Sequence, residues 1–144
     1  MLGNLAFSNA DNRARIAQIC LDDILGSMSS YLQNADLQCH GMLCLTNLAH
    51  ENDANKRLIA SHSGATTILD GMEAHLGSLK VQKQACWSLL TISGDTAAAQ
   101  RAAADGSVGA VLAAMVNFIS EPDIQHFGLW ALTNAAYGSD ALAR

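Results

Sequence analysis

The sequence predicts an all-α protein built from stacked helices, and two observations carry that prediction. Of its 144 residues, 50% are hydrophobic and only 15% are charged, against about 25% charged residues in an average soluble domain. The chain has one proline and 11 glycines, a composition that excludes disorder and low complexity. The second observation is that short sequence blocks recur at a constant spacing, which is the signature of a repeat protein.

The string Leu-x-Asn-Leu-Ala defines the first set of recurring blocks. It stands at residues 2–6 and returns, with substitutions, at 45–49, 89–93 and 132–136, at spacings of 43, 44 and 43 residues. A second set, Ile-Leu-x-x-Met or Val-Leu-x-x-Met, begins at Ile24, Ile68 and Val111, at spacings of 44 and 43. Because both sets keep one register, we interpret the chain as tandem copies of one unit.

Each unit is expected to contain three helices. A short first helix follows a capping side chain, as at Asn52 and Asp53, and ends near a glycine such as Gly64 or Gly106. The second helix carries the block that ends in methionine. The third helix is the longest, at roughly 15 residues, and its positions 81, 85, 89 and 92 form a stripe that faces the core.

These expectations divide the chain into a remnant, three units and a tail. The expected segments are the end of a third helix at 1–8, units at 9–52, 53–95 and 96–138, and a short tail at 139–144. The first unit has Cys20 where the others have the turn region with glycine, and it is one residue shorter. A different corner is therefore expected there.

The third-helix strings resemble the armadillo repeat, whose unit of about 42 residues ends in a helix reading roughly Val-Gln-x-x-Ala-x-Trp-x-Leu-x-Asn-Leu-Ala. The matching strings are Val-Gln-Lys-Gln-Ala-Cys-Trp-Ser-Leu-Leu-Thr-Ile at 81–92 and Ile-Gln-His-Phe-Gly-Leu-Trp-Ala-Leu-Thr-Asn-Ala-Ala at 124–136. The resemblance covers essentially the whole chain. It implies a right-handed superhelical armadillo-type solenoid of about three three-helix repeats plus an N-terminal partial repeat. HEAT repeats are the near neighbour, but they have two helices per unit.

In an armadillo solenoid, the resemblance implies, successive third helices line a concave groove that binds an extended peptide. A bulky residue and the residue four later lie one turn apart on one helical face. An asparagine carboxamide can hold a peptide N–H and C=O together, and a tryptophan gives a flat wall for long side chains. The candidate peptide-binding residues are Leu43, Asn47, Gln84, Trp87, Thr91, Phe127, Trp130 and Asn134.

Importin alpha, a member of the armadillo family, pairs tryptophan with asparagine four residues later to bind basic localisation signals. Only Trp130 and Asn134 keep the whole pair here, since Leu43 replaces one tryptophan and Thr91 replaces one asparagine. This departure disfavours a dedicated nuclear-import role. Glu51 and Asp95 are possible contacts for basic side chains, or they cap the helix that follows each of them.

Structural interpretations of the same residues stay open. Asn47 and Asn134 could bond the neighbouring third helix, and Trp87 and Trp130 could be packing residues. The pair His40 and Cys44 supplies only two ligands, so no metal is expected, nor any other cofactor. No order of Ser, His and Asp, phosphate-binding glycine loop or pair of acids at a fixed offset is present, which predicts a protein that is not an enzyme.

Charge and hydropathy also restrict the partners. The formal net charge is -5 and the basic residues are scattered, which argues against nucleic acid. The most apolar window, 108–119, spans about a dozen residues where a bilayer span needs about 20, so no membrane partner is expected. Four cysteines without a Cys-x-x-Cys pair, and no signal-peptide pattern, are typical of a cytoplasmic or nuclear protein.

The predicted function is a non-catalytic protein–protein interaction module that binds an extended peptide segment. The alternative is a structural repeat fragment that homo-oligomerises through its ends, because neither end carries the polar cap that usually closes a solenoid. In that case the residues exposed for self-association are expected to be Leu2, Leu5, Val111, Met115 and Phe118.

Overall fold

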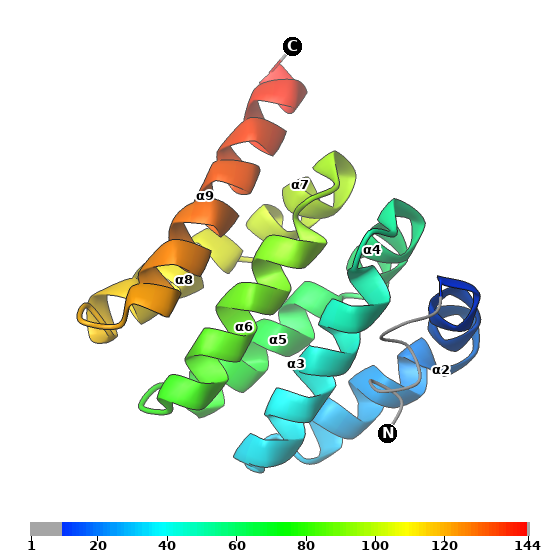
Figure 1. Cartoon of the computed structure of the whole chain (residues 1–144), viewed down its shortest axis with the longest axis horizontal. Coiled ribbons are helices and arrows are strands. Elements are labelled where there is room, and N and C mark those ends of the chain that lie inside the picture. The colour runs from blue at the N-terminus through cyan, green and yellow to red at the C-terminus, as the bar shows by residue number, and fades with distance from the viewer. Residues whose placement is uncertain (1–9, 144) are drawn as a thin grey trace.

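The structure of the protein is a computed structural model that describes the backbone of residues 10–143 and the side chains of residues 10–137. This part of the chain forms eight α-helices and no strand, which confirms the all-α prediction. The helices are α2 (Ala10–Ser30), α3 (Ala35–Ala49), α4 (Asp53–Ser61), α5 (Gly64–Ala74), α6 (Leu79–Ile92), α7 (Thr96–Ala104), α8 (Ser107–Asn117) and α9 (Pro122–Ala143) (Figure 1). The expected remnant at 1–8, with Leu2 and Leu5, lies outside the described residues.

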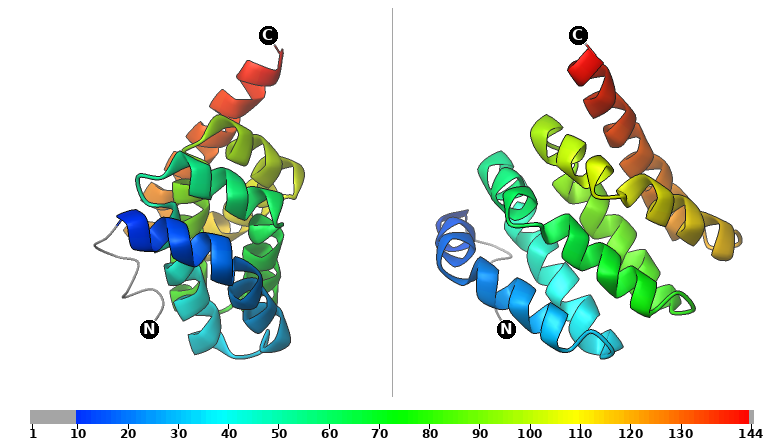
Figure 2. Two further views of the ribbon diagram at one scale, coloured as in Figure 1. Left: turned by 90° about the vertical axis from the view of Figure 1, so that its right-hand side faces the viewer. Right: turned by 180° about the vertical axis from the view of Figure 1, so that it is seen from behind.

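The helices pack in two layers. Helices α3, α6 and α9 lie side by side on the near side of Figure 1, with α6 in contact with both of the others. Seen from behind, α2, α5 and α8 form the other layer (Figure 2). Helix α4 packs on α7, α5 packs on α8, and α2 contacts both α4 and α5. Helices that are 43 or 44 residues apart in the sequence therefore become neighbours in space.

The core lies between the two layers and is mainly apolar, with a few buried polar side chains that are hydrogen-bonded across helices. The stripe predicted at positions 81, 85, 89 and 92 is buried, with at most 1% of each residue exposed. Met42, Leu45 and Leu48 of α3 are fully buried in the same way. Since burial of one such large side chain contributes about 1.5–3 kcal/mol, this core is the main source of stability.

Polar side chains begin four of the helices. The side chains of Asn34, Asn52, Ser78 and Asp95 each accept a hydrogen bond from the backbone N–H three residues later, at 2.9–3.3 Å. Each bond satisfies one of the amides that a helix leaves free at its start, and contributes about 1 kcal/mol. The cap expected at Asn52 is confirmed.

The turn between the first two helices of the second expected unit differs from the sequence interpretation. The residue with left-handed backbone there is Ser63, at φ 61°, and Gly64 is the first residue of α5. Gly64 is needed for another reason, since a Cβ on it would lie 2.8 Å from the carbonyl oxygen of Ile59. At the corresponding turn of the next unit, Gly106 itself has the left-handed backbone, at φ 106°.

One glutamine contact occurs three times at corresponding positions. In each case Nε2 of the fourth residue of a long helix donates to two carbonyl oxygens, seven and ten residues earlier, at the end of the preceding helix. The bonds run from Gln38 to Met28 and Tyr31, from Gln82 to Met72 and His75, and from Gln125 to Met115 and Phe118, at 2.8–3.1 Å. The carbonyl groups at the end of the preceding helix thereby gain a donor from the next long helix.

Two helices are longer than expected. The region around Cys20 holds no break, and α2 continues from Ala10 to Ser30, although its first turns run in a different direction from its second half (Figure 2). Helix α9 does not stop near Gly138 but continues to Ala143, so most of the expected tail at 139–144 is helical. Alanine and leucine after Gly138 favour helix, and one glycine costs too little to end it.

Candidate functional site

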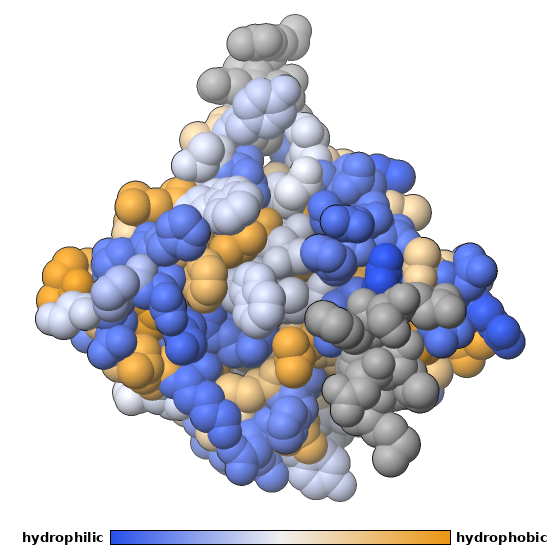
Figure 3. Space-filling model, viewed as in Figure 1, coloured by the Kyte–Doolittle hydropathy of each residue, from blue (hydrophilic) through white to orange (hydrophobic). Residues whose placement is uncertain are grey.

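A groove of about 670 Å³ crosses the layer of long helices and is the strongest candidate for a binding site. It opens on the face shown in Figure 3, where apolar and polar side chains alternate over α3, α6 and α9. Its lining consists of Cys39, His40 and Leu43 from α3, Leu79, Lys80, Lys83, Gln84 and Trp87 from α6, and Asp123 and Phe127 from α9. The volume lies in the range of small ligand sites.

Three side chains from three helices form the apolar wall of the groove. The rings of Trp87 and Phe127 stack across α6 and α9, with centroids 6.1 Å apart and planes inclined by 19°. Leu43 supplies the matching surface from α3. Although Trp87 contributes to this wall, 42% of it is exposed, so it can contact a ligand without unfolding the helix.

Gln84 is one of the polar residues that line the groove. Its Nε2 atom is buried and has no hydrogen-bond partner within the part of the chain that the structure describes. A buried donor left without an acceptor costs about 1–3 kcal/mol, and such groups are rare in folded proteins.

The rim of the groove carries two ion pairs that connect neighbouring helices. Lys80 of α6 bonds Asp36 of α3, and Lys83 of α6 lies 3.4 Å from Asp123 of α9. The hydrogen bond and charge of Lys80 hold the pKa of Asp36 below its usual value, and the bond to Asp36 raises the pKa of Lys80. Both pairs are exposed, so they orient the rim and contribute little to stability.

The structure brings four of the eight predicted peptide-binding residues into this groove: Leu43, Gln84, Trp87 and Phe127. The other four, Asn47, Thr91, Trp130 and Asn134, do not line it. Trp130 is 53% exposed and meets the ring of His126, one turn earlier on α9, edge-on at 5.9 Å. Half of the predicted peptide-binding residues therefore line the groove, and the other half lie outside it.

Asn134 bonds the neighbouring helix, as its structural interpretation proposed. Its Nδ2 atom donates to the carbonyl oxygen of Leu90, at 3.1 Å, in the last turn of α6, and lies 3.5 Å from the hydroxyl of Ser93. Thr91 turns its hydroxyl to the carbonyl oxygen of Trp87 on its own helix, at 2.9 Å. A peptide that binds the Nδ2 atom of Asn134 would have to replace its hydrogen bond to Leu90. Contact of Asn134 and Thr91 with a peptide stays a prediction.

The two candidate acidic contacts have different surroundings. Asp95 caps α7 and its Oδ1 lies 2.7 Å from Nη1 of Arg57, with 11% of the side chain exposed, which confirms the capping alternative. Glu51 caps no helix, because Asn52 holds that position. Glu51 has left-handed backbone, at φ 48°, and 80% of its side chain is exposed.

The expected exposure of Val111 is wrong, since only 1% of the residue is accessible and it belongs to the core. Met115 and Phe118 are half-buried against that core. The exposed face of α8 differs from the prediction by one position. Val111 of the recurring block lies on the buried side of the helix, and Leu112, which follows it, lies on the outer side. The exposed large apolar residues at this end of the molecule include Leu112, Val116, Ile119 and Leu129.

The lysines of the groove were missed by the sequence interpretation. Lys80 and Lys83 stand four residues before Gln84 and Trp87, which places each pair on one side of α6. That spacing was the available signal. The armadillo pattern does not contain this signal, because it is defined at the tryptophan and asparagine positions.

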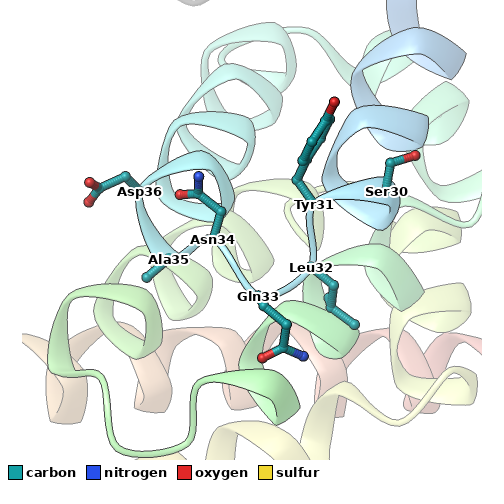
Figure 4. Close-up of a pocket in the computed structure, with 7 residues that line it drawn as sticks. All are labelled: Ser30, Tyr31, Leu32, Gln33, Asn34, Ala35 and Asp36. Carbon is teal, nitrogen blue, oxygen red and sulfur yellow. The ribbon is translucent and has the colours of Figure 1, made fainter.

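A second hollow, of about 710 Å³, is formed by residues 30–36 alone, between α2 and α3 (Figure 4). Its side chains point in different directions, with Tyr31 and Leu32 turned away from each other (Figure 4). Asn34 already uses its side-chain oxygen to cap α3. This hollow follows the shape of a turn and does not gather groups from several elements.

The four cysteines carry free thiols, and three of them are buried. Burial raises the pKa of Cys39 and Cys44, and raises that of Cys86 to about 11.

Among the described residues no group of three or more His, Cys, Asp or Glu is arranged to hold a metal ion. None of the described helices has the length and apolar character needed to cross a membrane.

Comparison with family models and with curated proteins finds no match for this chain.

Proposed function

We propose that this chain is a non-catalytic protein–protein interaction module that binds an extended peptide across α3, α6 and α9. The observation that carries the proposal is the groove itself, which combines an aromatic wall from two helices with polar and charged side chains along its lining. An extended peptide offers both the side chains and the main-chain carbonyls that such a groove can bind.

We further infer that the fold is a right-handed armadillo-type solenoid of about three repeats. The threefold glutamine contact supports this, since one contact at three corresponding positions is what a duplicated unit produces. The neighbouring positions of helices 43 or 44 residues apart support it as well. A protein of this class works by presenting a surface, and its natural compartment would be the cytoplasm or the nucleus.

The dimensions of the groove limit what it binds. Packed helices lie about 8–10 Å apart, so three of them span roughly 16–20 Å between the outer axes. An extended chain at about 3.3 Å per residue would place about five or six residues along that distance. Affinity on the order of micromolar is expected, because ordering a flexible peptide opposes binding.

Selection from a library of short random peptides displayed on phage tests the proposal. Peptides enriched on the wild-type protein are synthesised and their binding is measured by fluorescence anisotropy. Substitution Trp87→Ala removes half of the aromatic wall and is expected to weaken binding at least tenfold, a typical loss for a central aromatic contact. Trp130→Ala, measured in parallel, shows whether the peptide also extends beyond the groove.

Tyr31→Ala is the matched control, because it removes an aromatic side chain that is 61% exposed and lies outside the groove. Thermal melting of each variant separates loss of binding from loss of folding. If no peptide is enriched, or if Trp87→Ala binds as tightly as the wild type, the groove is not a peptide site.

A second candidate function is self-association through the α8–α9 end, and one comparison favours it. Met42 of α3 and Cys86 of α6 are fully buried, while Leu129, at the corresponding position of α9, is 59% exposed. Leu112 and Val116 of α8 and Ile119, in the turn that follows it, are exposed as well. We infer that another helical layer can cover this end, and that a second copy of the chain can supply it.

Sedimentation velocity over a range of protein concentrations tests this second candidate. The wild-type protein is expected to associate as its concentration rises, and the substitutions Val116→Lys and Leu129→Lys are expected to keep it monomeric by placing a charge in an apolar contact. Leu76→Lys serves as control, since Leu76 is 54% exposed in the turn after α5 and is not part of the exposed apolar set of α8 and α9. A monomeric wild type at high micromolar concentration would eliminate the candidate.

A further inference from the structure

A hollow of about 360 Å³ lies between α5 and α8, which are neighbours in the layer seen from behind (Figure 2). The peptide groove belongs to the other layer, so this α5–α8 hollow is a separate feature. Leu69 of α5 and Ala113 of α8 supply apolar lining, together with Leu76 from the turn after α5. The volume is near the lower limit for ligand pockets, so the hollow has room for about one long side chain.

The charged residues that line the α5–α8 hollow are all carboxylates. Asp105 accepts from Nε of Arg101 on α7, at 3.2 Å, and is already paired. Asp70 and Glu73 are exposed, and neither forms an ion pair with a residue that the structure describes. They stand three residues apart on α5, so they share one face of the helix and repel each other. A cation placed between them would remove that repulsion.

The repeated unit does not require these two carboxylates. The corresponding residues, 44 positions earlier and 43 positions later, are Gly26 and Ser29 in α2 and Ala113 and Val116 in α8. None of the four is charged, although the three helices occupy the same layer. The acidic pair is therefore specific to the α5–α8 hollow and is not part of the packing that these helices share.

Gln82 of α6 adds a buried acceptor to the same hollow. The residue is only 2% exposed, and it lines the hollow. Its Nε2 atom is held by the carbonyl oxygens of Met72 and His75, which fixes the orientation of the amide. Its Oε1 atom accepts no hydrogen bond from the described residues and, unlike Oε1 of Gln38, is not sealed from solvent. Buried amide oxygens normally have a donor, so this one is available to a donor that enters the hollow.

We propose that the α5–α8 hollow binds a basic side chain, arginine in preference to lysine, that a partner protein inserts from its surface. The cationic head lies against Asp70 and Glu73 and donates to Oε1 of Gln82, while the aliphatic stem lies on Leu69 and Ala113. Arginine fits better than lysine because its guanidinium group carries donors on every nitrogen, in one plane, and can bond several acceptors at once.

The lining favours this class of ligand over others. The two free carboxylates and the amide oxygen are all acceptors, so a ligand rich in donors matches them. A phosphate group or a nucleic acid would be repelled by the carboxylates. A hydrated metal ion would leave the apolar lining unused, whereas arginine and lysine bury an apolar stem and keep a charged head in water. This site goes beyond the proposed function, because it uses another face of the molecule and another ligand.

The test begins with short random peptides displayed on phage and selected on the wild-type protein. An excess of the double variant Asp70→Asn with Glu73→Gln competes in solution, so only peptides that need the two carboxylates are kept. These peptides are expected to contain arginine. Their binding, measured by fluorescence anisotropy, is expected to weaken by about tenfold on the double variant, a typical loss for a charge pair at an interface.

A second double variant is the matched control for charge. Asp23→Asn with Glu121→Gln makes the same two chemical changes and the same change in net charge at residues outside the hollow. It is expected to bind the selected peptides as the wild type does. Equal weakening by the two double variants would show general electrostatic attraction and would overturn the site. Thermal melting of both variants separates loss of binding from loss of folding.

A variant that fills the hollow tests the shape of the site without changing its charge. Ala113 is exposed, so Ala113→Trp is tolerated by the core and occupies the place of the incoming stem. Binding is expected to weaken by about tenfold, whereas Ala97→Trp, at an exposed alanine outside the hollow, is expected to have no effect. Unchanged binding by Ala113→Trp would overturn the role of the hollow.

Two changes of ligand complete the experiment. A peptide with citrulline in place of arginine keeps the shape of the side chain and loses its charge, and it is expected to bind much more weakly. Equal binding of the citrulline peptide would overturn the cationic ligand class. N-acetyl-arginine amide, followed by NMR, tests a free cation. Chemical shift changes around the hollow with this compound, but no selected peptide, would assign a small-molecule cation and overturn the partner protein.

The outcomes are independent of the peptide groove. Trp87→Ala is expected to leave the binding of these peptides unchanged, because Trp87 lies in the other layer. Peptides that lose binding with Trp87→Ala, and keep it on the double variant Asp70→Asn with Glu73→Gln, would support the groove and overturn this inference. The reverse result would support the α5–α8 hollow even if the groove binds no peptide.

Discussion

Buried polar side chains connect the helices of this protein at the scale of single residues. The hydroxyl oxygens of Thr46 on α3 and Ser88 on α6 lie 2.7 Å apart, and each is within hydrogen-bond distance of the carbonyl oxygen of Met42. Asn55 of α4 donates to the carbonyl oxygen of Leu48 at 2.8 Å. Because a slipped arrangement would leave these groups without partners, they select one register of packing.

The substitution Gln82→Leu tests the threefold glutamine contact. Gln82 is 2% exposed, and its loss would remove one of two donors from each of the carbonyl oxygens of Met72 and His75, which keep the backbone N–H groups of His75 and Ser78. We expect the free energy of unfolding to fall by about 1–2 kcal/mol, the effect of losing two hydrogen bonds, measured by urea denaturation. The same change at the exposed Gln33 is expected to have almost no effect. Equal midpoints for the two variants would contradict the importance of the contact.

The buried thiol of Cys86 predicts a loss of stability at alkaline pH. Its pKa is raised from 9.0 to about 11 by burial, so the unfolded chain releases this proton first as pH rises. The stabilising contribution is complete below pH 9 and is lost between about pH 9 and 11, by about 2 kcal/mol. Urea denaturation of the wild type and of Cys86→Ala at pH 8 and pH 11 measures it. The difference in stability between them is expected to shrink at pH 11, and a constant difference would contradict the assignment.

At the scale of the helices, capping and small residues decide where elements begin and how closely they approach. A Cβ on Gly41 of α3 would lie 2.5 Å from Sδ of Met28, and one on Gly128 of α9 would lie 2.6 Å from Sδ of Met115. Both glycines let a long helix pack directly on a methionine of the preceding helix. Ala85, at the corresponding position of α6, is fully buried.

Two glycine-to-alanine substitutions are expected to change stability in opposite directions. Gly26 lies within α2 with nothing near the added Cβ, so Gly26→Ala should raise the free energy of unfolding by about 0.5–1 kcal/mol through helix propensity. Gly41→Ala should lower it by about 1–3 kcal/mol, because Met28 is 1% exposed and has little room to move. Thermal melting compares the two, and a stabilising Gly41→Ala would show that the contact is loose.

The sequence predicted helix type better than helix ends. Periodic apolar residues and the capping side chain of Asn52 placed α4, α5 and α6 correctly, because those signals are local. The sequence did not predict that α2 is continuous. The absence of a glycine near Cys20 indicates that a turn is not required there, but it does not exclude one. The extension of α9 was not predicted, because the helix was expected to end near Gly138.

The candidate site could be predicted only in part for a related reason. The positions of Leu43, Gln84, Trp87 and Phe127 follow from helical spacing, and these four residues do line the groove. Whether Asn134 reaches a neighbouring carbonyl depends on the distance between two helices, which the sequence does not contain. The pairing of Lys80 with Asp36 depends on the same distance between helices.

At the scale of the whole molecule, each helix depends mainly on its neighbours along the stack. Helix α5 packs between α2 and α8, while the outer side of α8 carries the exposed Leu112 and Val116. Stability in such an arrangement is the sum of local contributions and contacts between neighbours. Helices at an open end are therefore expected to open more easily than helices inside the stack.

Hydrogen exchange measured by mass spectrometry tests this difference on two helices of equal length. Helices α5 and α8 each have 11 residues, so they form a matched pair. We expect the amides of α8 to exchange faster than those of α5 in the monomeric protein. Equal protection of the two helices would mean that the molecule opens only as one cooperative unit.

The two ion pairs between long helices have a consequence for the rim of the groove. Lys80 with Asp36 and Lys83 with Asp123 both lie near the starts of these helices, while the bond from Asn134 to Leu90 lies near the end of α6. Salt weakens the first two and leaves the third nearly unchanged, since the Debye length falls from about 8 Å at 0.15 M to about 3 Å at 1 M. Raising the ionic strength is thus expected to release the charged side chains of the rim, while the buried core keeps the helices packed.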